Sequence, residues 1–289
     1  GVLASFLGYV NMLMWPVSSL GWTASLIQRA IASQKRINEF LHHQPSVVDA
    51  GGIEKEIEGS IVFDHVSFTY PDTGIQALKD VTFDLKRGQR IAIIGRTGSG
   101  KTTIADLLMR MYDVSSGKIL IDGAEIKNYN LRSLRRQIGF VPQDVFLFSE
   151  TITENISFGL DKSDKEIATR FAHYASIGEE IEGFPQGYET MVGERGVTLS
   201  GGQKQRISIA RGLIKQPNVL ILDDSLSAVD TATEKQIQQN LDKVLAGKTA
   251  IIITHRIFSL IHFDNILVLD GGRIAEQGTH EVLLKMKGI

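Results

Sequence analysis

The chain of 289 residues contains no cysteine, only six prolines, and no charged side chain among residues 1–28. Without thiols, a disulfide framework, cysteine-ligated zinc or iron–sulfur sites and a cysteine nucleophile are all excluded. Any chemistry must therefore use carboxylates, histidine, lysine, hydroxyls and the backbone. Because 31 basic side chains face 33 acidic ones, the net charge indicates no general attraction to nucleic acid or acidic lipid.

The uncharged segment 1–28 is long enough to cross a bilayer, which takes roughly 20 apolar residues in a helix. Arg29, Lys35 and Arg36 follow it, and such a positive cluster predicts that this end lies in the cytoplasm. A few polar residues and one proline dilute the run, as in a helix that packs among others or lines a polar cavity. A buried helix of a soluble protein is the alternative interpretation.

Apolar residues at helical spacing continue from this segment to Leu41, so we expect one long helix over residues 1–41. Pro45 and the pair Gly51 and Gly52, followed by several glutamates, are typical of a surface linker, which we place at residues 42–59. A second domain is then expected over residues 60–289.

Short apolar runs alternate with helical patterns in this second domain. Runs that are rich in β-branched residues and covered on both faces are typical of the sheet of an α/β fold. The predicted strands are residues 61–70, 81–85, 90–94, 219–222, 250–253 and 266–269.

A glycine-rich loop follows the strand 90–94 and precedes a helical pattern. Its residues are Gly95, Arg96, Thr97, Gly98, Ser99, Gly100, Lys101, Thr102 and Thr103. This matches the phosphate-binding loop, or P-loop, G-x-x-x-x-G-K-[ST], in which backbone N–H groups and a helix N-terminus hold a polyphosphate. Lys101 would contact the β- and γ-phosphates, and the Thr102 hydroxyl would bind magnesium. A simple glycine turn is the alternative, which the strand–loop–helix context disfavours.

Two acids, Asp223 and Asp224, end the predicted strand 219–222. Asp223 is placed to hold magnesium, directly or through water. Asp224 would then lie near the γ-phosphate, where a general base or a water-positioning group belongs. Taken alone, such a pair would more often be a helix cap or a solvated turn.

The segment Leu199-Ser200-Gly201-Gly202-Gln203, upstream of Asp223, distinguishes this chain from other P-loop enzymes. It resembles the LSGGQ signature of the ATP-binding cassette (ABC) family, and other motifs of that family follow the same order along the chain. The resemblance implies that Tyr70 stacks on adenine, that Gln143 reaches magnesium and the attacking water, that Asp230 belongs to the D-loop, and that His255 contacts the γ-phosphate. Each motif taken singly has an ordinary structural explanation; their order carries the argument.

The resemblance implies a P-loop NTPase sheet core with an antiparallel β subdomain and a helical signature subdomain, preceded by one long membrane-derived helix. The loop Gly193-Glu194-Arg195-Gly196 resembles that of exporters of the multidrug and lipid-flippase type, and residues 9–41 resemble their last transmembrane helix. ATP and Mg²⁺ are the implied cofactors, with Thr102, Gln143 and Asp223 at the metal. The implied location is the cell membrane, multi-pass in the parent protein, with the ATP-binding domain on the cytoplasmic side.

The signature also forms an anion site, because Ser200, Gly201, Gly202 and Gln203 open a predicted helix. One phosphate has little need of two such sites in one domain. The family's arrangement is a head-to-tail pair of half-transporters, alike or different, in which each ATP lies between one chain's P-loop and the other's signature. One helix cannot enclose a translocation path, so the rest of the transmembrane domain is expected outside this sequence.

One residue departs from the family pattern, since the acid after the magnesium aspartate is usually glutamate and here is Asp224. Compared with glutamate, its side chain is one methylene shorter, so the carboxylate is drawn back by about 1.5 Å. As a general base it would then reach the attacking water less easily. The hypothesis is a slow site, as in asymmetric heterodimers; a slow homodimer is the alternative.

We therefore expect the ATP-hydrolysing motor of an exporter, with no nucleic-acid partner. Two other classes stay open at this stage. A soluble ABC-type ATPase acting on nucleic acid would share the P-loop and the signature, but the uncharged segment 1–28 and the balanced charge argue against it. An ATP-gated binding module with little hydrolysis would be favoured by Asp224. A P-loop kinase would leave the signature without a purpose.

Overall fold

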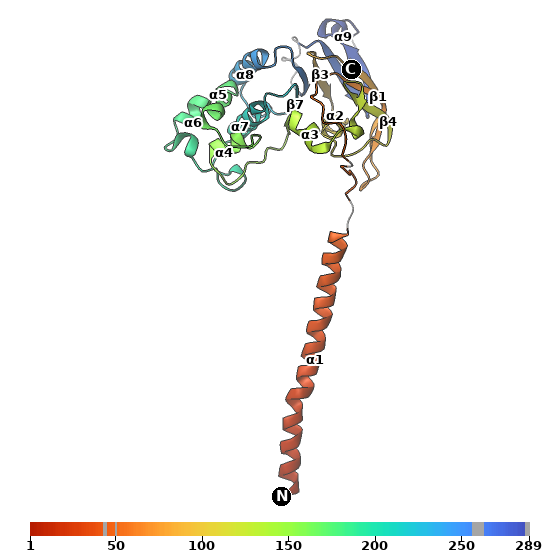
Figure 1. Ribbon diagram of the computed structural model, residues 1–289, viewed down its shortest axis with the longest axis vertical. Coiled ribbons are helices and arrows are strands. Elements are labelled where there is room, and N and C mark those ends of the chain that lie inside the picture. The colour runs from red at the N-terminus through yellow and green to blue at the C-terminus, as the bar shows by residue number, and fades with distance from the viewer. Residues whose placement is uncertain (43–44, 50, 256–262, 287–289) are drawn as a thin grey trace. The chain divides into compact units, whose positions relative to one another are not determined.

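The computed structural model describes all residues except 43–44, 50, 256–262 and 287–289 (Figure 1). It divides into two compact units, Gly1–Ser46 and Val47–Ile289. The domain division into 1–41, 42–59 and 60–289 stays a prediction. Of the predicted linker 42–59, the residues from Val47 onward belong to the second compact unit.

The first unit is one helix, α1 (Val2–Leu41), with no buried residue. In the described part of the chain it is the one helix long and apolar enough to cross a membrane. Its apolar side chains, Trp15 and Trp22 among them, are exposed along its length, and the one long N-terminal helix that we predicted is confirmed. An exposed apolar surface of this kind is stabilised by an apolar environment.

The second unit contains two sheets. The six-stranded sheet has the order β10-β9-β3-β8-β7-β6, parallel except for β10 at its edge. The four-stranded sheet is antiparallel, with the order β2-β1-β4-β5. The strands are β1 (Ile61–Thr69), β2 (Gln76–Leu85), β3 (Arg90–Gly95), β4 (Ser116–Ile121), β5 (Ala124–Glu125), β6 (Ile138–Val141), β7 (Val219–Asp223), β8 (Thr249–Ile253), β9 (Asn265–Asp270) and β10 (Arg273–Gly278).

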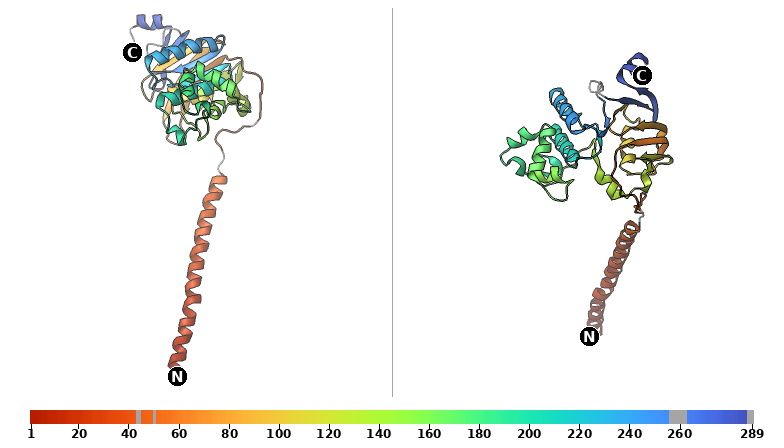
Figure 2. Two further views of the ribbon diagram at one scale, coloured as in Figure 1. Left: turned by 90° about the vertical axis from the view of Figure 1, so that its left-hand side faces the viewer. Right: turned by 45° about the horizontal axis from the view of Figure 1, so that its top comes forward.

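The helices of this unit fall into two groups. Helices α4 to α7 gather in a separate lobe, away from β1 and β4, as Figures 1 and 2 show. Helix α8 contacts α5 of this lobe, whereas α2, α3 and α9 contact strands. The helices are α2 (Lys101–Leu108), α3 (Leu131–Gln137), α4 (Ile152–Ser157), α5 (Lys165–Tyr174), α6 (Gly178–Glu182), α7 (Gly201–Ile214), α8 (Thr231–Val244) and α9 (His280–Met286).

Two large apolar clusters underlie this division. One joins the antiparallel sheet, α2 and one face of the six-stranded sheet, with Phe63, Leu107 and Ile251 among its members. The other joins the helical lobe to the opposite face, with Ile156, Leu213 and Leu220. The predicted α/β fold, with an antiparallel β subdomain and a helical subdomain, is therefore confirmed.

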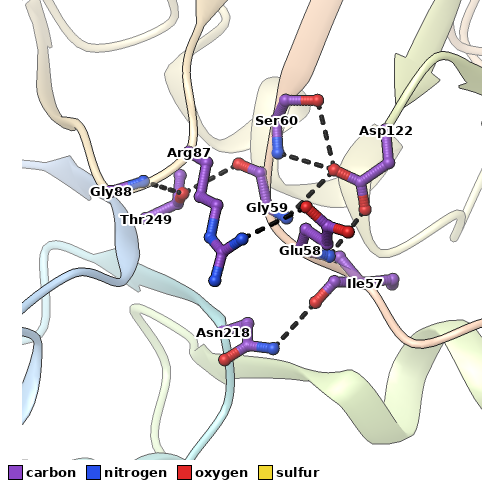
Figure 3. A network of polar contacts seen from close by, with 9 residues as sticks. All are labelled: Ile57, Glu58, Gly59, Ser60, Arg87, Gly88, Asp122, Asn218 and Thr249. Atoms are coloured by element: carbon purple, nitrogen blue, oxygen red, sulfur yellow. Dashed lines mark hydrogen bonds and ion pairs between the residues drawn. The ribbon is translucent and has the colours of Figure 1, made fainter.

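The segment that leads into β1 is held by a polar network (Figure 3). Both carboxylate oxygens of Asp122 accept from successive backbone N–H groups, those of Glu58, Gly59 and Ser60, at 2.7 to 3.1 Å. The Ser60 hydroxyl adds a fourth bond at 3.1 Å. Hydrogen bonds to an ionised acceptor are stronger than neutral ones, so Asp122 fixes the point where the chain enters the sheet.

The same segment is tied to the starts of two strands of the six-stranded sheet. The Asn218 amide, just before β7, donates to the Ile57 carbonyl at 2.8 Å. The Thr249 hydroxyl, at the start of β8, donates to the Gly59 carbonyl at 2.8 Å and accepts from the N–H of Gly88 (Figure 3). A side chain at Gly59 would meet this hydroxyl at 2.7 Å, so the contact requires glycine.

Replacing Asp122 by alanine should lower the free energy of unfolding by about 2 kcal/mol, because N–H groups lose a charged acceptor. Asp122 also has a left-handed backbone, φ 49°, which alanine adopts less readily. Asp122→Asn should lose less, since asparagine tolerates this conformation and keeps one acceptor oxygen. Thermal unfolding of the full-length protein measures the effect, with exposed Asp72→Ala as control. Equal stability of Asp122→Ala and Asp72→Ala would contradict this account.

Candidate active site

A cleft of about 480 Å³ lies where parallel strands end. Strand β3 lies between β8 and β9, and β7 pairs with β8, so their carboxyl ends share one edge of the sheet, where ligands of such folds bind. Of the predicted site residues, the cleft is lined by Tyr70, Thr97, Gly98, Gly100, Lys101, Thr102, Thr103, Gln143, Asp223, Asp224 and His255. The structure thus brings together motifs that are separated by up to 185 residues of sequence.

The P-loop between β3 and α2 depends on the small size of glycine. Gly100, at φ 101°, precedes α2, and a side chain there would lie 2.6 Å from the Ala77 carbonyl. Gly95, at φ 154°, lies so close to the Leu269 carbonyl that a Cβ would overlap it. These two close contacts position the loop at the start of α2. The backbone N–H groups there and the helix dipole favour an anion.

Lys101 is the buried cation of this loop, with 6% of its surface exposed. Its Nζ donates to the carbonyls of Gly95 and Arg96 at 2.9 Å each, which holds the loop around the ammonium. Burial lowers the pKa of Lys101, and the charges of Asp223 and Asp224 oppose that shift. A partly desolvated ammonium of this kind interacts strongly with phosphate.

Asp223 is almost fully enclosed, with 1% of its surface exposed. Its Oδ2 has no hydrogen-bond partner among the residues that the structure describes. Burial raises the pKa of Asp223, while a hydrogen bond from Thr102 and the charge of Lys101 lower it. A buried carboxylate oxygen without a partner, next to a threonine hydroxyl, has the oxygen chemistry that Mg²⁺ prefers.

Asp224 follows directly at the end of β7 and is half-buried. Its backbone is left-handed, with φ 44°, a conformation that few residues other than glycine adopt. Two hydrogen bonds hold this turn. The N–H of Asp224 donates to the Ile253 carbonyl at 2.9 Å, and the Asp224 carbonyl accepts from the Ser227 hydroxyl at 2.9 Å.

Tyr70 lines the cleft at the end of β1. Its hydroxyl shares a 3.0 Å hydrogen bond with the Thr103 hydroxyl, and its ring packs edge-on against Phe68 and Tyr112. Thr103 is buried and its hydroxyl is engaged with Tyr70. Adenine stacking by Tyr70, and nucleotide contacts by Thr103 and the buried Ser99, stay predictions.

The signature residues do not line this cleft. Ser200 and Gln203 form a reciprocal cap at the start of α7: Ser200 Oγ accepts from the Gln203 N–H at 3.2 Å, and Gln203 Oε1 accepts from the Ser200 N–H at 2.9 Å. Gly201 and Gly202 occupy the first two helical positions, where N–H groups lack a partner within the helix.

Asp230 is likewise absent from the lining of the cleft. Its carboxylate caps α8 and accepts from the N–H groups of Ala232 and Thr233 at 3.1 and 3.0 Å. A hydrogen bond from the Thr233 side chain, together with those from the backbone N–H groups of Thr233 and Ala232, holds the pKa of Asp230 below its ordinary value. Within one chain the predicted nucleotide contacts therefore fall into two separate groups.

Sequence reasoning missed several residues of the cleft. The start of β2 and the turn Gly271 and Gly272 form part of its wall, and the N–H of Lys79 donates to the Gly272 carbonyl at 2.7 Å. Apart from Lys79, none of these residues carries a charge that would indicate phosphate binding. Gln205, on the buried side of α7, was also missed, although a polar residue on the apolar face of the signature helix was an available signal.

Comparisons with known proteins agree with this geometry. The sequence profile described as "ABC transporter" matches residues 78–227. The chain belongs to the ABC transporter family. It is 48% identical, over its full length, to the probable multidrug resistance ABC transporter ATP-binding/permease protein YheI of Bacillus subtilis, of which it covers 49%. It is 43% identical, again over its full length, to the ATP-dependent lipid A-core flippase of Pseudomonas aeruginosa, of which it covers 48%.

A solved structure extends this likeness to three dimensions. A bacterial Atm1-family ABC exporter with ATP bound superposes with a TM-score of 0.86, at 40% identity, over 97% of this chain and 49% of the exporter chain. The chain spans about half the length of the curated relatives it matches. It contains the nucleotide-binding domain of an ABC transporter together with one long N-terminal helix.

Proposed function

We propose that this ABC chain binds and hydrolyses ATP with Mg²⁺ and thereby drives transport across a membrane. The observation that carries the proposal is the cleft itself, which gathers Lys101, Asp223, Asp224, Gln143 and His255 at one edge of the sheet.

The residues of the cleft have separable tasks in phosphoryl transfer. Lys101 and the N-terminus of α2 neutralise the phosphates. Asp224 orients and deprotonates the attacking water, and His255 contacts the γ-phosphate from the end of β8. Asp223, Thr102 and Gln143 would hold Mg²⁺, and the metal would supply charge neutralisation of the phosphates.

The signature at the start of α7 serves a second chain. Ser200, Gly201 and Gly202 lie outside the P-loop cleft. The N–H groups of Gly201 and Gly202, at the first positions of α7, are therefore available to an ATP held by a partner. Two half-transporters would therefore close head-to-tail around two nucleotides. The partner is the same chain or a related one that carries glutamate in place of Asp224.

A transmembrane partner domain is supported by an exposed aromatic group near Gln143. Phe146 and Phe158 are exposed, and both rings contact Phe148, which stacks with Phe158 at 4.4 Å between centroids. Exposed apolar clusters of this kind mark interaction surfaces. We place the contact with the membrane domain here, with the ATP-binding domain on the cytoplasmic side.

The class of substrate follows from the relatives, which are described as multidrug transporters and lipid A-core flippases. An amphipathic molecule that partitions into the membrane is therefore the proposed cargo. An ABC-type ATPase acting on nucleic acid is not favoured, since α1 is exposed and apolar.

The experiment is reconstitution of the full-length protein in liposomes, with phosphate release and movement of a fluorescent lipid measured together. We expect ATP and Mg²⁺ to support both. Nucleotide binding without phosphate release would contradict the proposal and favour an ATP-gated module. Phosphate release without movement of any amphipathic probe would contradict the transport part alone.

A further inference from the structure

Gln205 connects the signature helix to the loop that carries Asp224. It lies one helical turn after Gly201 on α7, with 7% of its surface exposed. Its Oε1 accepts from the N–H of Ala228 at 2.9 Å, and its Nε2 donates to the Ser227 hydroxyl at 3.0 Å. Both partners belong to the loop between β7 and α8. The buried amide of Gln205, on α7, therefore satisfies hydrogen-bonding groups of the loop after β7.

The direction of these hydrogen bonds is fixed by chemistry. The Ala228 N–H can only donate, so the carbonyl oxygen of the Gln205 amide must face it and the amide nitrogen must face Ser227. The Ser227 hydroxyl therefore accepts from Gln205 and directs its own hydrogen to the Asp224 carbonyl, 2.9 Å away. A directed chain of bonds runs from Gln205 through Ser227 to Asp224.

This series of hydrogen bonds ends at a residue with an unusual backbone conformation. Asp224 is left-handed, and two of the bonds that hold it, from the N–H and the hydroxyl of Ser227, converge on its carbonyl at 3.3 and 2.9 Å. The hydroxyl bond is the one whose direction depends on Gln205. The orientation of the carboxylate at the P-loop cleft is therefore sensitive to the amide on α7.

Close packing joins the two elements at a second point. A side chain at Gly202 would lie 2.9 Å from the Ala228 carbonyl, so the signature glycine lies directly against this loop. The start of α7 cannot shift toward the loop without displacing Ala228. Displacement of Ala228 would move its N–H relative to the Gln205 amide that accepts from it.

We propose that Gln205 is a positioning residue that couples the signature to Asp224. When a second chain's nucleotide closes onto Ser200 and the start of α7, Gln205 and Ser227 set the carboxylate of Asp224 at this chain's own P-loop. The two ATP sites of a dimer then communicate through one chain. This inference rests on the proposed function, because it requires hydrolysis at the P-loop cleft.

The first test compares Gln205→Glu with Ser227→Ala in the full-length transporter. A glutamate of equal size still accepts from Ala228 but draws the Ser227 hydroxyl away from Asp224. Each variant should lower kcat by about tenfold and change the KM for ATP by less than about twofold, because the acid is misplaced while the phosphate contacts are intact.

The matched controls separate positioning from folding and from charge. Gln236→Glu adds the same charge on the exposed side of α8 and should retain the wild-type kcat. Ser227→Thr keeps the hydroxyl and should restore activity to within about threefold of wild type. The thermal midpoint of Ser227→Ala, at an exposed position, should match that of the wild type.

A double-mutant cycle tests whether Gln205 and Ser227 act through the same series of hydrogen bonds. Gln205→Glu combined with Ser227→Ala should lose no more kcat than either single variant, and the Hill coefficient for ATP should fall toward one in all three. Multiplicative losses would show independent effects and would overturn the proposal. So would a wild-type kcat in both single variants.

These outcomes are distinguishable from failure of the proposed function. If the wild-type transporter shows no phosphate release that depends on Lys101, the proposed function fails and this inference fails with it. If that release is present but unaffected by Gln205→Glu and Ser227→Ala, the inference alone is overturned.

Discussion

Replacing Lys101 by alanine is expected to lower ATP hydrolysis by the full-length protein by at least about 10²-fold, because the transition state loses its buried phosphate contact. Lys101 is the ammonium enclosed by the P-loop, with hydrogen bonds to Gly95 and Arg96. Without it, Asp223 and the phosphates would lose the buried ammonium that lines the cleft. Steady-state phosphate release with Mg²⁺ measures the effect.

The matched control is Lys118→Ala, which removes an exposed lysine paired with Asp64 on the antiparallel sheet. It should hydrolyse ATP at the wild-type rate, since exposed ion pairs contribute little. Retention of hydrolysis by Lys101→Ala to within about threefold of that control would remove Lys101 from the phosphate site. A parallel thermal-unfolding measurement keeps loss of activity apart from loss of fold.

Replacing Asp224 by glutamate is expected to raise kcat by about tenfold or more, because the longer side chain brings the base closer to the water that Asp224 reaches only with difficulty. The backbone of Asp224 is held by Ile253 and Ser227, so the loop does not advance to compensate for the short side chain. The added methylene then moves the carboxylate about 1.5 Å further into the cleft.

Two companion variants make this result specific. Asp224→Asn has the same size but cannot take a proton, and should lower kcat. Asp223→Glu adds the same methylene to the carboxylate that is proposed to hold the metal rather than the water, and should not raise it. Unchanged turnover in Asp224→Glu would contradict the idea that reach limits this site; single-turnover phosphate release is the measurement.

Much of the catalytic cleft could be predicted because its chemistry is local in sequence. A glycine-rich loop between a strand and a helix favours phosphate binding, and the acids after β7 share the sheet edge with it. Positions of Tyr70, Gln143 and His255 followed only from the family resemblance, and the structure places all three in the cleft.

Contacts between distant segments were beyond sequence reasoning. The bonds from Asp122 to residues 58–60 join groups more than 60 residues apart, and no local pattern encodes them. Strand β2 begins at Gln76, earlier than the predicted 81, because pairing with β1 overrides the weak strand preference of its first residues. Gln205 acquires its meaning only when α7 packs against the loop after β7.

Partition of the nucleotide contacts between two chains is the central claim of this account. The signature residues do not line the P-loop cleft, and we propose that a second chain supplies them. Thr97 is exposed in the P-loop and Ser200 is exposed at the start of α7, which makes the two positions suitable for thiol labels. The 289 residues contain no cysteine. Once any cysteine elsewhere in the full-length protein has been replaced, only the added thiols react.

The most direct measurement is a cross-link between a cysteine at Ser200 of this chain and one at the position matching Thr97 in the chain that pairs with it. We expect a covalent dimer that forms with ATP and Mg²⁺ and is lost when the P-loop lysine of the Thr97-matching chain is replaced by alanine. Absence of that dimer, or formation of the same cross-link within a single chain carrying both cysteines, would contradict the account.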